Sequence, residues 1–203
     1  MIMETLQPDN IHWSENVILA DADYLGQVAF DLTVYFERAL NRRLPAADFS
    51  TWAVDVALDG GLRAGDHETQ VVLVHDKNTA ELRCFTPARL DSELNAQAFR
   101  DDKLGEFIIS SFPVESVTTK GQYLEDILTT LLAQDDVRRI MVVADTEGGD
   151  SMDHVRRALR DYDDDVKHVT VLGMQQQPGG RFRQELLGYS VINALGIKAD
   201  ELK

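Results

Sequence analysis

The alternation of short apolar runs with amphipathic segments in the second half of the chain restricts the fold most. From residue 106 onward the pattern reads strand, helix, strand, helix, strand, helix. The apolar runs that predict strands cover residues 106–112, 139–144 and 168–173. Alternation of this kind is typical of parallel βαβ units. We therefore expect an α/β protein, a Rossmann-like α/β/α sandwich with a mainly parallel central sheet.

The helices of that half are predicted from their spacing of apolar residues. One carries Leu124, Ile127, Leu128, Leu131 and Leu132 on one face, and two more cover residues 151–162 and 182–195. We expect the 203 residues to form a single α/β domain.

The first half of the chain contributes a strand and two helices. Residues 1–15 are predicted to be an irregular lead-in, and residues 17–20 form an apolar run typical of a buried strand. Apolar residues then recur at helical spacing from Leu25 onward, which predicts a helix that ends near Arg43. A second helix is predicted over residues 46–58.

The middle of the chain is predicted to contain a hairpin. Two apolar runs, residues 70–75 and 81–85, are separated by a turn signal at residues 76–78. Cys84, the only cysteine, lies in the second run and is expected in the core, and a single cysteine excludes an internal disulfide. Residues 88–103 are expected to form a short helix or an ordered loop.

The charge of the chain argues against a strong nucleic-acid binder. With 20 basic and 35 acidic residues the net charge is −15, and a field of that sign repels phosphate backbones. Contact with RNA would require a local basic patch. Four groups of arginines could form such a patch, and the alternative is that they merely balance nearby acidic residues. The candidates are Arg42 with Arg43, Arg138 with Arg139, the group Arg156, Arg157 and Arg160, and Arg181 with Arg183.

The sequence contains no sign of a membrane segment. No apolar run approaches the roughly 20 residues that span a bilayer, and the N-terminus lacks the basic and apolar stretches of a signal peptide. We expect a cytoplasmic protein without a membrane partner.

Acidic residues follow two of the apolar runs directly. Asp21 and Asp23 follow the first predicted strand, and Asp145, Glu147 and Asp150 follow residues 139–144. Ligands of open α/β sheets bind outside the carboxyl ends of the strands, where such side chains can converge. Asp23 and Asp150 are explained as helix caps, so the candidate site consists of Asp21, Asp145 and Glu147. Converging carboxylates suit Mg²⁺ or a similar hard cation.

Several short motifs resemble those of the PIN-like nucleases, especially their NYN branch. The run from Ile18 to Leu25 is similar to that family's first motif, with Asp21 at the Asp position and Tyr24 where the family has Asn. The run from Lys120 to Asp126 is similar in rhythm to a later motif but lacks its Asp. The run from Val143 to Gly148 keeps both acids of a third motif. The whole chain also resembles uncharacterised proteins of similar length from Bacteroidetes.

The resemblance implies a metal-dependent ribonuclease-like protein. Asp21 and Asp145 would be ligands of Mg²⁺ or Mn²⁺, Glu147 would be a further ligand or would orient the attacking water, and Lys120 would neutralise phosphate. The missing Asn and Asp leave a catalytically inactive relative as an open alternative.

Two other functions remain open from the sequence. Asp21 and Asp23 after an apolar strand resemble the nucleophile and general acid of haloacid-dehalogenase-like phosphatases, with Ser110, Lys120 and Asp145 in that family's order. A non-enzymatic acidic interaction module is the third reading, including a homodimer formed through apolar faces around Trp52 and the C-terminal helix.

Overall fold

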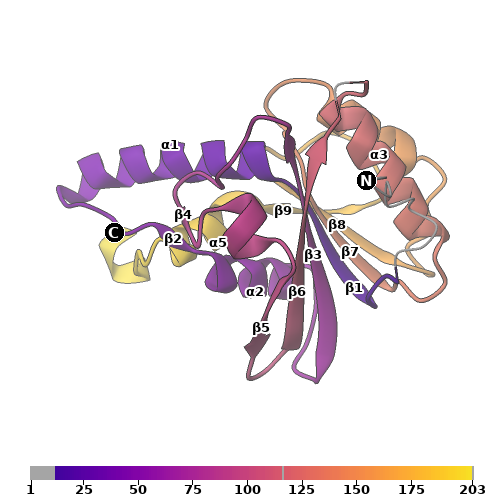
Figure 1. The fold of residues 1–203 in the computed structure, drawn as a ribbon, viewed down its shortest axis with the longest axis horizontal. Coiled ribbons are helices and arrows are strands. Elements are labelled where there is room, and N and C mark those ends of the chain that lie inside the picture. Colours follow the sequence, from indigo (N-terminus) through magenta and orange to yellow (C-terminus); the bar gives the residue numbers. More distant parts are fainter. Residues whose placement is uncertain (1–11, 116, 203) are drawn as a thin grey trace, which may run out of the picture.

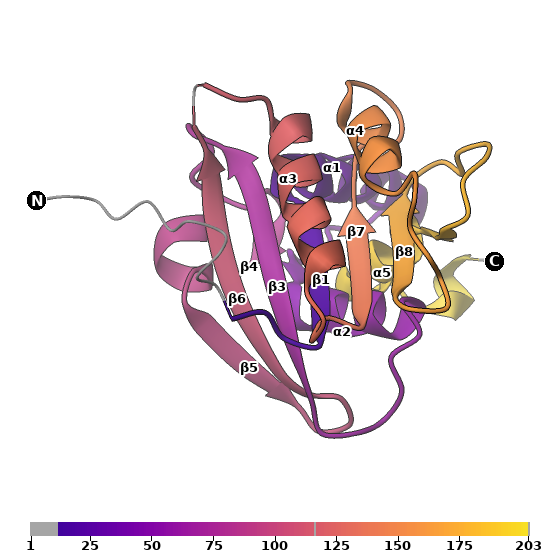
Figure 2. The same ribbon diagram turned by 90° about the vertical axis from the view of Figure 1, so that its right-hand side faces the viewer.

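The computed structural model describes residues 12–115 and 117–202 of the chain. A seven-stranded sheet forms its centre in the order β5-β6-β3-β1-β7-β8-β9, and only the β5–β6 pair is antiparallel. Helices cover both faces of this sheet (Figures 1 and 2). The expected Rossmann-like α/β/α sandwich with a mainly parallel sheet is therefore confirmed.

The strands of the large sheet are β1 (Asn16–Asp21), β3 (His67–Asp76), β5 (Gln97–Asp101), β6 (Gly105–Val114), β7 (Arg139–Val143), β8 (His168–Gly173) and β9 (Arg183–Leu186). The α-helices are α1 (Ala22–Leu40), α2 (Phe49–Asp59), α3 (Lys120–Ala133), α4 (Ser151–Ala158) and α5 (Leu187–Ala194). Two short strands, β2 (Ala47–Asp48) and β4 (Phe85–Thr86), pair with each other. A π-helical turn covers Leu90–Leu94 and a 3₁₀ turn covers Ala199–Leu202.

Each face of the sheet has its own hydrophobic core. Helices α1, α2 and α5 share one core with Ile18 and Ala20 of β1, whereas α3 and α4 share the other with Val17 and Leu19. Successive residues of a strand point to opposite faces. All six residues of β1 are buried, which explains why this strand reads as a continuous apolar run rather than as an alternating one.

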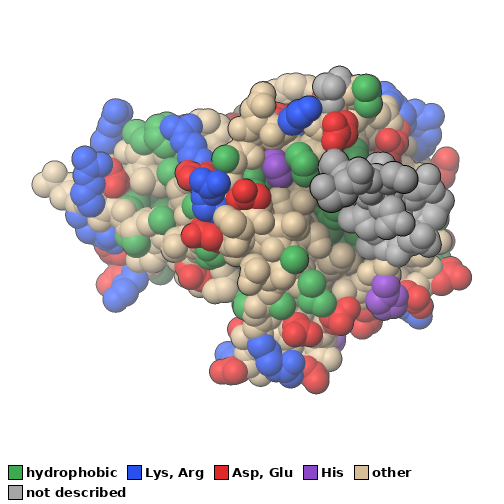
Figure 3. Space-filling model, in the orientation of Figure 1, with side chains coloured by type: hydrophobic (Ala, Val, Ile, Leu, Met, Phe, Trp, Pro, Cys, Tyr) green, Lys and Arg blue, Asp and Glu red, His purple; other side chains and the backbone are tan. Residues whose placement is uncertain are grey.

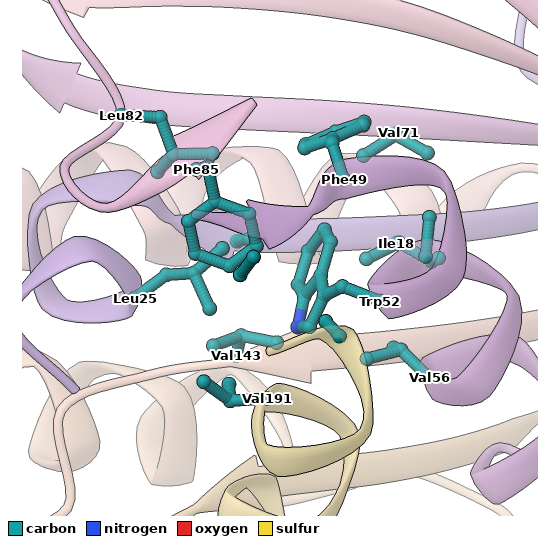
Figure 4. Packing of buried hydrophobic residues seen from close by; sticks show 14 of the residues in the cluster. Ile18, Leu25, Phe49, Trp52, Val56, Val71, Leu82, Phe85, Val143 and Val191 are labelled. Carbon is teal, nitrogen blue, oxygen red and sulfur yellow. The ribbon is translucent and has the colours of Figure 1, made fainter. Parts of the chain in front are cut away.

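Trp52 of α2 lies at the centre of the first core. It is fully buried and packs against Phe49 and Phe85, with ring centroids 5.4 and 6.0 Å away (Figure 4). Val191 of α5 belongs to the same core. The sequence left open a homodimer through apolar faces around Trp52 and the C-terminal helix. Trp52 itself is inside the core, so its side chain is not part of an exposed face.

The predicted hairpin over residues 70–85 is wrong. β3 pairs with β1 and β6, both in parallel, and residues 81–85 do not form its partner strand. Leu82 and Phe85 are instead buried in the core beneath the helices, and Cys84, with a positive φ of 63°, is only half-buried and lies outside any strand. The apolar residues of this segment thus serve the helical layer and not the sheet.

Further boundaries differ from the sequence prediction: α1 ends at Leu40 rather than near Arg43, and α4 ends at Ala158 rather than at residue 162. The expected loop or helix at residues 88–103 contains β5, and the expected start of the last helix contains β9; both are edge strands with little burial.

β6 also continues through Pro113, where the sequence predicts its end. β3 pairs with β6 through Pro113, but the amide of Ser111, two residues earlier, points away from β3 and donates to Asn95. An amide at position 113 would point to the same side, where β5 pairs with β6 only as far as Ile109, so the proline is tolerated.

Among the described residues, no helix has both the length and the apolar character needed to cross a membrane.

Asp59, the last residue of α2, provides a test of the packing between α2 and β9. Burial, with the charges of Glu185 and Asp55, raises the pKa of Asp59 from 3.8 to about 6. A folded-state pKa above the unfolded one stabilises the protein at low pH, and this contribution is lost as the pH rises through about 6. We expect Asp59→Asn to raise the free energy of unfolding at pH 7.5 by about 1 kcal/mol, an amount reduced for solvent screening because the burial is partial and much of the Asp59 surface remains accessible to water.

Denaturant unfolding at pH 7.5 and pH 4 measures this effect. The gain should be much smaller at pH 4, where the native carboxyl is neutral and the unfolded one, with its pKa of 3.8, is partly protonated. Asp102→Asn, at an exposed position, serves as the control and should change stability little at either pH. An equal gain at both pH values would contradict the electrostatic explanation.

Candidate functional site

The candidate site lies at the carboxyl end of β1, where the order of the sheet reverses. The chain passes from β1 to β3 and β6 on one side of β1, and then returns to β7 and β8 on the other. In open α/β sheets ligands bind at such a switch point. Asp21 ends β1 and its side chain caps α1, because Oδ1 accepts a hydrogen bond of 3.0 Å from the amide of Tyr24.

Lys120 joins three carboxylates at this end of the sheet. It is the first residue of α3, and its Nζ lies 2.8 Å from Asp23 Oδ2, 3.2 Å from Asp21 Oδ1 and 3.5 Å from Asp76 Oδ2. The Lys120 side chain is only 19% exposed. These four residues, hereafter the Lys120 cluster, come from β1, α1, β3 and α3, and so connect both helical layers to the sheet.

The charges of the cluster are tightly linked. Burial raises the pKa of Asp21, which is 2% exposed, and the Lys120 charge offsets this only in part. Burial alone would raise the pKa of Asp23, but hydrogen bonds from Lys120, Thr79 and the Asp76 amide lower it. Burial alone would lower the pKa of Lys120, and the two carboxylates raise it. The ammonium form of Lys120 is thus favoured inside the cluster.

The assignment of helix caps from the sequence needs two corrections. Asp21, not Asp23, caps α1. The carboxylate of Asp23 accepts hydrogen bonds from the Asp76 amide at 2.7 Å and from Thr79 Oγ1 at 2.5 Å, besides Lys120. Asp150 occupies the N-cap position of α4 without a capping hydrogen bond from its side chain. Its carboxylate lies 3.4 Å from His154 Nε2 instead.

Asp76 was missed by the sequence analysis, although the same signal was present. It is the last residue of the apolar strand β3 as Asp21 is the last residue of β1, and the two residues lie close because their strands are parallel neighbours. The sequence prediction instead assigned Asp76 to a hairpin turn at residues 76–78, so it was not included among the candidate site residues.

Asp145 has a local role that the sequence did not suggest. Its Oδ1 accepts hydrogen bonds from the amides of Glu147 and Gly148 at 2.9 and 3.0 Å. This is an Asx turn, in which the side chain organises its own loop. The carboxylate of Asp145 is therefore engaged by the turn between β7 and α4.

Glu147 and Thr146 meet α1 through the hydroxyl of Tyr24. This hydroxyl lies 3.4 Å from Glu147 Oε2 and 3.3 Å from Thr146 Oγ1, and it accepts a hydrogen bond of 3.1 Å from the amide of Met174. Tyr24 stands where the NYN pattern has Asn, and here it ties the loops after β7 and β8 to α1. Gly173 permits this approach, since a Cβ there would lie 2.2 Å from Thr146 Cγ2.

The arrangement does not fit a divalent metal at the predicted ligands. Within residues 12–115 and 117–202, no three His, Cys, Asp or Glu side chains form a group that could hold one metal ion, so Asp21, Asp145 and Glu147 are not brought together as a ligand set. The positive charge beside Asp21 is the ammonium of Lys120. Binding of Mg²⁺ or Mn²⁺ remains a prediction from the resemblance.

Three of the nine arginines proposed as basic patches form ion pairs with acidic residues of the described part of the chain. Arg42 pairs with Glu201 at 2.7 Å, Arg43 with Glu37 at 2.8 Å and Arg157 with Glu125 at 2.9 Å. Figure 3 shows basic and acidic side chains mixed over one face of the molecule, with several basic ones at the far end of α1. For these three arginines, the pairs support the reading that they balance nearby acids.

Two of the proposed patches meet across a hollow of about 880 Å³ beside α4. Arg156, Arg160 and Arg181 line it. Four aspartates, at positions 161, 163, 164 and 165, line the same hollow, so it is not a basic surface. RNA binding through these residues remains a prediction.

The chain matches a family of unknown function (DUF6621) over residues 10–202 and therefore belongs to that family. No curated protein and no solved structure matches it.

Proposed function

We propose that this family member is a PIN/NYN-like protein in which Lys120 supplies the positive charge that a metal ion supplies in the active nucleases, and that it acts as an interaction module rather than as a metal-dependent ribonuclease. The observation that carries the proposal is the position of Lys120 Nζ within 3.5 Å of three carboxylates. Lys120 lies in the motif that resembles the nuclease family.

The charge of the Lys120 cluster supports this reading. A divalent cation that used Asp21 and Asp23 would have to approach Nζ at close range or displace it. Displacement would break ion pairs that are largely shielded from water, which is costly because each partner then loses its compensating charge. Lys120 thus competes with a metal for the same oxygens.

The second enzyme reading, a haloacid-dehalogenase-like phosphatase, has less support. Its nucleophile would be Asp21, whose carboxylate must reach a phosphorus atom. Asp21 is 2% exposed and its Oδ1 contacts both Lys120 and the Tyr24 amide.

An interaction role agrees with the net charge of −15, which attracts cationic partners and repels RNA.

The experiment compares wild type with Asp21→Asn in two assays. Thermal unfolding with Mn²⁺ or Mg²⁺ should show no stabilisation of wild type, whereas metal present at 100 times its Kd would add about 2.7 kcal/mol. Incubation with single-stranded RNA and Mn²⁺ should give no cleavage above the level of Asp21→Asn. Metal-dependent cleavage by wild type that is lost in Asp21→Asn would overturn the proposal.

A further inference from the structure

A pocket of about 360 Å³ that is lined by several polar side chains lies at the carboxyl ends of β3 and β6, next to the Lys120 cluster. Its lining includes His75 and Ser111 from the two strands, Asn78 and Thr79 from the loop after β3, and Asn95 after the π-helical turn. None of the functions considered above uses His75, Ser111 or Asn95.

His75 and Ser111 face each other because of the register of the two strands. β3 and β6 are parallel, with Ser111 opposite Leu73 and His75 two residues further along. Leu73 and Ile109 belong to the core beneath α1 and α2, so the period of two places His75 and Ser111 on that same face. Ser110, the preceding residue, points to the other face.

The contacts of the His75 ring define its tautomer. Nδ1 lies 2.9 Å from the backbone carbonyl oxygen of Asp76, and Nε2 lies 3.0 Å from Ser111 Oγ. A carbonyl oxygen only accepts hydrogen bonds, so Nδ1 must carry a proton. In the neutral ring Nε2 is then unprotonated and accepts the hydroxyl proton of Ser111. The Ser111 hydroxyl, the His75 imidazole and the Asp76 carbonyl thus form one chain of hydrogen bonds, in which the carbonyl orients the imidazole base.

We propose that Ser111 and His75 form a nucleophilic site for small carboxylic esters, with Ser111 as the nucleophile and His75 as the general base. The backbone carbonyl of Asp76 takes the orienting role that a carboxylate has in a serine triad. His75 is 6% exposed, whereas Ser111 is half-buried at the pocket. This inference goes beyond the proposed function and does not depend on it, because it uses no metal and takes from the Lys120 cluster only the backbone carbonyl of Asp76, not its carboxylate.

Asn95 provides a donor for the developing negative charge. Its Oδ1 accepts a hydrogen bond of 2.9 Å from the amide of Ser111, which holds the side chain beside the serine. The same side-chain amide carries an NH₂ group that can donate to an oxyanion.

The proposed reaction is ester hydrolysis, which consumes only the ester and water. Ser111 Oγ bonds to the ester carbonyl carbon while His75 Nε2 takes the hydroxyl proton. The bond from that carbon to the alcohol oxygen then breaks, and Nε2 returns the proton to the leaving alcohol. Water attacks the resulting acyl-serine by the same proton transfers, which releases the carboxylic acid and restores Ser111. A pocket of about 360 Å³ has room for an ester with a short acyl chain.

The test uses a fluorophosphonate probe, which reacts with activated serines, and p-nitrophenyl acetate as the substrate, both with a chelator present. Mass spectrometry of the labelled wild type should locate the probe on Ser111. Labelling and ester hydrolysis should be lost in Ser111→Ala and fall at least about 100-fold in His75→Gln, the lower range for loss of a general base. Ser110→Ala, altered at the neighbouring serine, should retain both.

Labelling of wild type needs no variant to fold, so it decides the proposal by itself. Absence of probe on Ser111, or equal hydrolysis by wild type and Ser111→Ala, would overturn it. Because the chelator removes divalent ions, a nuclease activity that depends on metal cannot produce the expected result.

Discussion

Lys120→Met is expected to lower the free energy of unfolding by about 3 kcal/mol, the usual cost of removing one partner of a buried ion pair. The loss is large because Asp21 is almost fully buried and would keep a charge without its cation. The variant should also gain stability from Mn²⁺, which wild type should not, since a cation can then enter between Asp21 and Asp23. Denaturant unfolding with and without Mn²⁺ measures both effects.

Two further variants make this result specific to the Lys120 cluster. Lys103→Met removes an exposed lysine and should cause little loss and no response to Mn²⁺. Adding Asp21→Asn to Lys120→Met should recover part of the stability, because the unpaired buried charge is removed, and should weaken the response to metal. If Lys120→Met and Lys103→Met behave alike, Lys120 does not hold the place of a cation.

Trp52→Ala is expected to lower the free energy of unfolding by about 3–5 kcal/mol. Trp52 is a residue of α2, and its side chain is fully buried in the core among residues of β4, α5 and the sheet (Figure 4). Alanine at this position therefore leaves a cavity. The contacts of its ring with Phe49 and Phe85 would be lost at the same time. Urea unfolding monitored by circular dichroism measures the change.

Trp52→Phe is the matched control. It keeps an aromatic ring in the core and removes the indole Nε1, which is buried without a hydrogen-bond partner. Leaving a buried donor unpaired is unfavourable, so this variant should lose much less stability than Trp52→Ala. A small loss in Trp52→Ala would show that Trp52 is not part of a tightly packed core.

The fold was predicted well where burial alone decides the sequence pattern. The strands β1, β7 and β8 are buried on both faces, which demands the apolar runs seen at residues 17–20, 139–144 and 168–173. The edge strands β5 and β9 carry no such demand. They read as polar segments, and only their pairing partners make them strands.

The candidate site was predicted only in part, for a related reason. A carboxylate after an apolar strand is visible in the sequence, and that signal identified Asp21 and Asp145. The sequence does not show which group each of these carboxylates contacts. Asp145 is engaged by amides two and three residues away, whereas Asp21 meets Lys120, 99 residues further along the chain.

The sequence by itself determined the layered α/β architecture and the acidic ends of its strands, because hydrophobic periodicity follows from local burial. Only the tertiary structure decided what those acids do. It placed the first residue of α3 between the ends of β1 and β3, and it aligned His75 with Ser111 across two strands. Such contacts depend on strand order and register, which arise when distant segments pack together and leave no periodic pattern in the chain.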